Sequence, residues 1–205
     1  MAHPDWNESY AEGFLPWDTS RPDPLLTAFV ESGRVRPVRT LEVGCGTGNN
    51  ALWLAEGGFD VLGVDVAPLA VEMARAKQNG AARCRFESLD FLEAPPPGPF
   101  DFVFDRGCFH GFDEAEERAL FAAHVAGLLG PDGIWLSLIG STEGKPRDVG
   151  PPRRSAREII EAIEPVLELI ELRSDVFHAL PESPMVWFCL SRLRKVKAQP
   201  STRHD

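Results

Sequence analysis

Three glycines alternate with other residues between positions 44 and 48, directly after an apolar segment that contains Glu42. Seventeen residues after the last of them, Asp65 closes a second apolar segment. A glycine-rich turn between a strand and a helix lets backbone N–H groups approach a ligand. A carboxylate after the second strand can accept hydrogen bonds from both hydroxyls of a ribose. The spacing therefore predicts a nucleoside-binding site.

The glycine spacing separates two kinds of nucleoside cofactor. A dinucleotide-binding turn follows the pattern Gly-x-Gly-x-x-Gly, in which the start of a helix meets a diphosphate. Here the pattern is Gly44-x-Gly46-x-Gly48, and the preceding Glu42 would repel a diphosphate but suits a cationic amino-acid group. The combination favours S-adenosylmethionine over NAD. A glycine-rich turn with no ligand is the remaining alternative.

With Asp90 added, these motifs resemble those of the class I S-adenosylmethionine-dependent methyltransferases. The resemblance implies that Glu42 organises the methionine end of the cofactor, that Asp65 binds the ribose, and that Asp90 with Phe91 contacts the adenine. It also implies that the glycines allow the backbone to approach the ligand closely. The expected cofactor-binding residues are Trp17, Glu42, Gly44, Cys45, Gly46, Gly48, Asn49, Asp65, Val66, Asp90, Phe91 and Asp105.

Three shorter segments, 16–22, 100–107 and 150–152, are similar to the thiopurine S-methyltransferase and halide/thiol methyltransferase group. That similarity implies that Trp17 covers the methionine part of the cofactor. The alternative is that Trp17 only anchors the N-terminal segment to the sheet. The Gly-Pro-Pro sequence of the group is usually followed by an aromatic residue, but Arg153 follows it here. The methyl acceptor is therefore left open.

Asp105, Arg106 and His110 are the candidates for catalysis. An imidazole, with an ordinary pKa near 6.5, could take a proton from the acceptor, or His110 could be a packed, hydrogen-bonded residue. Asp105 could act as a base and contact the cofactor, or simply cap a helix. The similarity to the thiopurine group implies that Arg106 shapes the mouth of the site with Asp105; the alternative is that Arg106 pairs with a nearby carboxylate.

Three further arginines have two interpretations each. Arg118 lies approximately where the thiopurine group places an arginine that reaches toward the substrate, but it also lies four residues after Glu114 on an expected helix. Such spacing favours an ion pair. Arg153 and Arg154 could attract an anionic acceptor or be solvated.

Alternating strands and helices predict an α/β fold with helices on both faces of a mostly parallel sheet. The last two strands have no helix between them, which predicts an antiparallel hairpin at the edge, and the family resemblance implies a Rossmann-like, seven-stranded sheet. A turn is expected at 130–133, and segments 6–24 and 140–154 are expected as lids with little regular structure. The expected helices are 49–56, 68–79, 114–129 and 155–163, and the expected strands after the first are 61–64, 83–87, 100–104, 134–139, 167–176 and 184–193.

Composition sets the remaining expectations. The chain has 205 residues, of which 43% are hydrophobic, which suits one domain over 1–198 with an N-terminal lid or cap (1–36), a core (37–193) and a polar tail (194–205). A net charge of −10 argues against a nucleic-acid partner. No segment is apolar enough to span a membrane and no signal peptide opens the chain, so the expected location is cytoplasmic. Four widely spaced cysteines predict no metal site. No partner protein can be inferred.

The leading hypothesis is a methyltransferase that uses S-adenosylmethionine, releases S-adenosylhomocysteine, and acts on a small molecule. The acceptor atom is expected to be a soft nucleophile, such as a thiol, another chalcogen or a halide, since such an atom needs no strong base. Transfer to oxygen or nitrogen is the alternative. An NAD-dependent oxidoreductase and a cofactor-binding protein without catalysis are less favoured.

Overall fold

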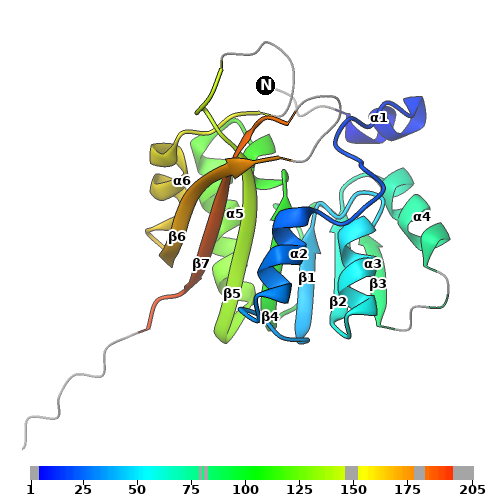
Figure 1. The fold of residues 1–205 in the computed structure, drawn as a ribbon, viewed down its shortest axis with the longest axis horizontal. Helices are drawn as coiled ribbons and strands as arrows, with labels where there is room; N and C mark the ends of the chain where they lie inside the picture. The colour runs from blue at the N-terminus through cyan, green and yellow to red at the C-terminus, as the bar shows by residue number, and fades with distance from the viewer. Residues whose placement is uncertain (1–4, 79, 81–82, 146–151, 178–182, 196–205) are drawn as a thin grey trace, which may run out of the picture.

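A single seven-stranded sheet forms the centre of the computed structural model, which describes residues 5–78, 80, 83–145, 152–177 and 183–195 (Figure 1). The strand order is β3-β2-β1-β4-β5-β7-β6. Strands β1 to β5 are parallel, and β7 runs antiparallel to both β5 and β6. The strands are β1 (Arg39–Val43), β2 (Asp60–Asp65), β3 (Cys84–Ser88), β4 (Phe100–Arg106), β5 (Leu129–Gly140), β6 (Leu167–Val176) and β7 (Met185–Leu193).

Helices cover both faces of the sheet (Figure 1). Side chains of α2, α3 and α4 pack on one face, and those of α5 and α6 pack on the other. None of the helices in the described part of the chain is long and apolar enough to cross a membrane. The helices are α1 (Trp6–Glu12), α2 (Pro24–Glu31), α3 (Asn49–Glu56), α4 (Pro68–Lys77), α5 (Ala115–Leu128) and α6 (Ala156–Ile163), with a 3₁₀ turn η1 (Phe109–Gly111).

The alternation of side chains along β4 divides the core in two. Phe102 and Phe104 belong to the cluster formed with α2 and α3, whereas Val103 belongs to the cluster formed with α5 and α6. Successive residues of a strand point to opposite faces, so Asp105 follows Val103 to the α5 side. This period-two pattern directs Asp105 and Arg106, the last two residues of β4, to opposite faces of the sheet.

The expected fold class is confirmed, including the antiparallel hairpin at the edge. Two local predictions were wrong. Segment 6–24 contains α1, which Asp5 caps by accepting a hydrogen bond from the backbone N–H of Glu8 at 3.1 Å. Residues 130–133 belong to β5 rather than to a turn, with a shift of register against β4. The absence of a Cβ at Gly133 permits this path, because a Cβ there would lie 2.9 Å from the carbonyl oxygen of Phe100.

Gly48 ends the glycine turn and starts α3. It is the N-cap of that helix with φ +79°, in the left-handed region. A Cβ at this position would lie 2.8 Å from Cζ of Phe86 and 3.0 Å from Cβ of Ala74. The absence of a side chain therefore allows α3 to pack closely against the neighbouring strand and helix.

Replacing Gly48 by alanine tests this packing, with Gly33→Ala as the matched control. Gly33 has φ +75°, and no atom lies within 4 Å of the point that a Cβ would occupy, so its substitution carries the backbone strain alone. We expect Gly33→Ala to lower the free energy of unfolding by about 1–2 kcal/mol and Gly48→Ala to lower it by a further ~1–3 kcal/mol. Equilibrium denaturation in urea measures both, and equal losses would contradict the packing role.

Candidate functional site

A cavity of about 960 Å³ opens beyond the carboxyl ends of β1, β2, β3 and β4. The strand order reverses between β1 and β4, and open α/β sheets bind their ligands at such a point. The volume lies near the upper end of the range for small-molecule sites, about 300–1,000 Å³. The cavity is therefore large enough for a cofactor and a second small molecule.

The cavity brings together most of the residues predicted for the site. Glu42, Gly48 and Asp105 do not line it, and each of the three is buried. Gly48 packs against Phe86, as described above. The predicted residues that do line the cavity are Trp17, Gly44, Cys45, Gly46, Asn49, Asp65, Val66, Asp90, Phe91, Arg106 and His110.

Asp65 holds the glycine turn. Its Oδ2 accepts a hydrogen bond from the backbone N–H of Gly46 at 2.8 Å, and its Oδ1 accepts one from that of Ala67 at 2.9 Å. A carboxylate has about four lone-pair sites, so two such bonds leave capacity for a ligand. Burial raises the pKa of Asp65 although these backbone bonds oppose the rise. Its position suits hydrogen bonds from a ribose.

Glu42 lies behind the cavity wall rather than in it. Its Oε1 accepts a hydrogen bond from Nδ2 of Asn50 at 2.9 Å, while its buried Oε2 has no partner among the described residues. Burial raises the pKa of Glu42 to about 8, so the side chain is neutral at pH 7. Asn50, which lines the cavity, is the residue that can touch a ligand here. A direct contact from Glu42, as the resemblance implied, does not fit this geometry.

Asp105 lies beneath the loop that follows β4. It is fully buried on the α5 side, where its carboxylate accepts hydrogen bonds from the backbone N–H of Phe109 at 3.0 Å and the indole N–H of Trp135 at 2.9 Å. Burial raises its pKa to about 6. This corrects the predictions that Asp105 contacts the cofactor and that it acts on the acceptor. Its position supports the loop from below, much as the capping alternative supposed.

Arg106 joins the N-terminal segment to the sheet. Its Nε donates to Oδ2 of the buried Asp23 at 2.5 Å, and its Nη1 donates to the carbonyl of Trp17 at 3.2 Å. The guanidinium lies over the ring of Phe177, 4.9 Å from the ring centre. Pairing with a carboxylate was the alternative interpretation of Arg106, and the structure supplies that carboxylate.

Trp17 both lines the cavity and anchors the N-terminal segment. It packs edge-on against Trp6 with the ring centres 5.6 Å apart, and its indole N–H donates to the hydroxyl of Tyr10 at 3.4 Å. The covering role and the anchoring role are therefore compatible. Tyr10 itself lies 3.0 Å from the position of a Cβ on Gly46, which places the segment directly over the glycine turn.

Asp18 was not predicted as a site residue, although it stands next to Trp17 in the motif. Its carboxylate accepts hydrogen bonds from the hydroxyl of Thr47 and the amide of Asn49, both at 2.6 Å, and from the backbone N–H of Ser20 at 2.7 Å. Burial opposes ionisation, but these bonds hold the pKa of Asp18 below its usual value. Asp18 thus ties the N-terminal segment to the glycine turn, and its place beside Trp17 in segment 16–22 was the available signal.

His110 lines the cavity and is buried, with Nδ1 accepting a hydrogen bond from the backbone N–H of Gly140 at 2.6 Å. Arg153 and Arg154 are not simply solvated: Arg153 donates to the carbonyls of Ser141 and Thr142, and Arg154 is buried. The neighbouring positions 150 and 151 of the predicted Gly-Pro-Pro motif lie outside the described residues.

The described lining fits a nucleoside with a cationic amino-acid end. Val66, about half exposed, and Phe91 offer apolar surface for a base, while Asp65 has acceptor capacity for a ribose. Asp90 is exposed beside them and accepts a hydrogen bond from the backbone N–H of Leu92 at 2.8 Å. The unpartnered Oε2 of Glu42 lies behind Asn50, and a cation near it would favour its ionised form. These residues could hold the cofactor expected from the sequence.

The sequence model of the thiopurine S-methyltransferase family matches residues 1–183. The chain belongs to this family. Membership of the thiopurine S-methyltransferase family confirms the resemblance drawn from the glycine turn and the shorter motifs, and confirms S-adenosylmethionine as the expected cofactor.

Individual relatives are similar over most of the chain. Identity is 33% over 150 residues with probable thiol methyltransferase 2 of Arabidopsis thaliana, covering 72% of this chain and 65% of that protein. It is 28% over 152 residues with the 2-heptyl-1-hydroxyquinolin-4(1H)-one methyltransferase of Mycobacteroides abscessus, covering 72% and 66%. The chain thus spans about two thirds of the length of each relative. The solved 1,6-didemethyltoxoflavin-N1-methyltransferase of Burkholderia thailandensis shares the fold, with a TM-score of 0.72, 20% identity and coverage of 93% and 86%.

The neutral state of Glu42 in this member of the thiopurine S-methyltransferase family gives a test by pH. Its pKa rises from 4.5 to about 8 on folding, so its contribution to stability is fully present below about pH 4.5 and is lost as pH rises through about 8. Glutamine stays neutral throughout. We expect Glu42→Gln to match the wild type near pH 4.5 and to exceed its unfolding free energy by roughly 2–5 kcal/mol at pH 9.

Urea denaturation at the two pH values measures this difference. Asp60→Asn is the control, because Asp60 is exposed at the opposite end of the neighbouring strand and should give no such gain at pH 9. A Glu42→Gln variant that follows the wild type at both pH values would show that Glu42 is ionised in the folded protein.

Proposed function

We propose that this chain is an S-adenosylmethionine-dependent methyltransferase that methylates a small molecule at a soft nucleophile, such as a thiol, another chalcogen or a halide. The observation that carries the proposal is the cavity, whose lining combines residues suited to a nucleoside with further aromatic side chains. Family membership and the thiol methyltransferase of Arabidopsis thaliana support the same reaction.

The cradle residues supply binding and orientation. Asp65 receives the ribose, Val66 and Phe91 flank the adenine, and Asp90 accepts from its amine. Asn50, backed by Glu42, meets the amino-acid end. When bound, S-adenosylmethionine supplies a methyl group on a positively charged sulfur, open to in-line displacement by a nucleophile. The main contribution of the protein to such a reaction is alignment in a site from which water is excluded.

The cavity is also lined by the aromatic side chains of Trp6, Phe14, Phe112 and Phe177, and we infer that the acceptor lies among them. Phe14 is 75% exposed, so it stands at the rim. An aromatic, apolar lining suits a polarisable acceptor atom and excludes water from it. The four described carboxylates on the lining each accept a hydrogen bond from a backbone N–H; they are Asp5, Asp18, Asp65 and Asp90.

Covalent catalysis by the protein is not required. The two cysteines on the lining, Cys45 and Cys108, are held as thiols because burial raises the pKa of each. A thiolate or halide acceptor is itself the nucleophile, so direct transfer needs neither an enzyme nucleophile nor a strong base.

Transfer to oxygen or nitrogen is the second candidate. The relative from Mycobacteroides abscessus is named for a hydroxyquinolinone, and that similarity favours the second candidate. Such an acceptor must lose a proton, so it needs a base that a thiolate does without. The single domain over 1–198, the cytoplasmic location and the absence of nucleic-acid, membrane and protein partners remain predictions.

Formation of S-adenosylhomocysteine across a panel of acceptors tests the proposal. The panel contains thiols, hydrosulfide, halides, thiopurines, catechols and small amines. We expect product with the sulfur or halide acceptors. Product with catechols or amines alone would contradict transfer to a soft nucleophile and support transfer to oxygen or nitrogen. No product with any acceptor would contradict the proposed reaction.

Asp65→Ala tests the cofactor half separately. Loss of hydrogen bonds from the ribose to a charged group should weaken binding of S-adenosylhomocysteine by more than about tenfold, or ~1.4 kcal/mol. Titration calorimetry measures the affinity, and circular dichroism establishes that the variant is folded. Asp60→Ala, at the other end of β2, is the control and should bind as the wild type does. An unchanged affinity in folded Asp65→Ala would remove Asp65 from the cofactor site.

A further inference from the structure

The ring of His110 is held in one tautomer by the end of β5. The backbone N–H of Gly140 points at Nδ1 over 2.6 Å, in a buried environment. A backbone N–H can only donate, so Nδ1 must be the unprotonated nitrogen of the ring. The proton of neutral His110 is then on Nε2. In this state the ring can give a hydrogen bond through Nε2 but has no free lone pair for taking a proton.

Two glycines fit around the ring and fix its orientation. A Cβ on Gly140 would lie 3.1 Å from Nδ1, and one on Gly107 would lie 3.2 Å from both Nε2 and Cε1. The edge of Phe177 closes a further side, with ring centres 6.1 Å apart and planes at 84°. A flip of the ring would bring Cδ2 in place of Nδ1 and leave the buried N–H of Gly140 without an acceptor, which costs about 1–3 kcal/mol.

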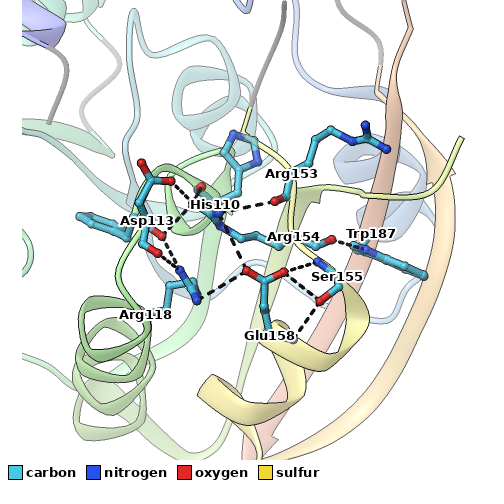
Figure 2. Close-up of polar contacts among 9 residues, drawn as sticks. His110, Asp113, Arg118, Arg153, Arg154, Ser155, Glu158 and Trp187 are labelled. Carbon is cyan, nitrogen blue, oxygen red and sulfur yellow. Dashed lines mark hydrogen bonds and ion pairs between the residues drawn. The ribbon is translucent and has the colours of Figure 1, made fainter. Parts of the chain in front are cut away.

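Arg154 holds the backbone that carries this ring. Its Nη2 donates to the carbonyl of His110 at 2.8 Å, to the carbonyl of Phe112 at 2.9 Å and to Oδ1 of Asp113 at 2.6 Å. Arg118 completes the support, since its Nη1 donates to the carbonyls of Phe112 and Asp113. Figure 2 shows the two arginines converging on this segment, with Glu158 joined to both.

Gly140 contacts both the ring of His110 and the backbone of Arg154. Its N–H holds the ring of His110, and its carbonyl accepts the backbone N–H of Arg154 at 2.7 Å. The carbonyl of Arg154 in turn accepts the indole N–H of Trp187 at 2.9 Å (Figure 2). The position of the His110 ring therefore depends on the end of β5, on the start of α6 and on β7.

We propose that His110 is a hydrogen-bond donor to the methyl acceptor, not a base, and that Arg154 is the residue that positions it. This inference rests on the proposed function and narrows it. A donor fixed in the cavity wall stabilises an acceptor that arrives as an anion, such as a thiolate or a halide. An acceptor that must lose a proton in the site finds no base at His110. Among the described residues, the charged groups that bind this segment or each other beside it are Asp113, Arg118, Arg154 and Glu158. Arg106 lies over Phe177, whose ring meets that of His110.

The tautomer can be observed directly. Long-range ¹H–¹⁵N correlation spectra of the full chain, labelled at histidine and compared with His110→Gln for assignment, distinguish a protonated ring nitrogen from an unprotonated one. We expect Nδ1 of His110 to be unprotonated and Nε2 to be protonated across the pH range of activity. A protonated Nδ1, or a ring that titrates together with activity, would overturn the inference. This readout does not depend on the identity of the acceptor.

A pair of substitutions separates donor from base. Glutamine places a side-chain N–H near the position of Nε2, whereas asparagine can offer only an acceptor to Gly140; neither is a base. With the best thiol of the panel, we expect both variants to lose kcat/KM, and His110→Asn to lose at least about tenfold more than His110→Gln. Equal losses in the two folded variants would overturn the donor role. An inactive wild type would instead contradict the proposed function, and the spectra would still test the tautomer.

Arg154→Gln tests the positioning role, with Arg153→Gln as the matched control. Arg153 also binds backbone carbonyls, but those of Ser141 and Thr142 rather than those beside His110. We expect Arg154→Gln to raise the KM for the acceptor about tenfold, with a change of less than about twofold in the KM for S-adenosylmethionine. The ¹⁵N signal of His110 Nδ1 should also shift. Arg154→Lys should restore part of the loss. Equal changes in both KM values, or no shift of the Nδ1 signal, would contradict the positioning role and leave Arg154 with a structural role only.

Discussion

The ion pair between Arg106 and Asp23 joins the N-terminal segment to the centre of the sheet. A charge this deeply buried is stable only when its partner and its hydrogen bonds are in place. Asp23 caps α2 by accepting from the backbone N–H of Leu25, and its own N–H donates to Asn50, the partner of Glu42. The roof of the cavity, α2 and the first strand therefore share one set of polar contacts. Removal of either charge would leave the other buried without its ion-pair partner.

The two halves of the cavity are built in different ways. The glycine turn after β1 is held by Asp65, at the end of the adjacent strand and 19 positions further along the chain. The acceptor wall comes from residues far apart, because Gly140 and Arg154 reach His110 from 30 and 44 positions away. Short-range pieces carry recognisable motifs. Long-range pieces carry none, and only the packed structure brings them together.

This difference explains what the sequence could and could not predict. The sheet, its edge hairpin and the cradle followed from apolar periodicity, glycine spacing and the carboxylate at Asp65. The side of the sheet reached by Asp105 depended on the register of β4, which a short apolar run does not reveal. The burial of Glu42, which raises the pKa of its carboxyl group, results from packing that the sequence does not show. Helix α1 was not predicted, although Asp5 and Gly13, at its two ends, are residues that commonly cap helices.

Arg154 binds its loop mostly through main-chain carbonyls, those of His110 and Phe112. Every amino acid presents the same carbonyl group, so the hydrogen bond from Arg154 to the carbonyl of residue 112 does not depend on the side chain at that position. These hydrogen bonds can consequently be kept when the side chain at position 112 is exchanged. Phe112 itself packs against Phe121, with the ring centres 5.7 Å apart, so such an exchange would act on the packing of the core and of the cavity wall rather than on the backbone hydrogen bonds of Arg154.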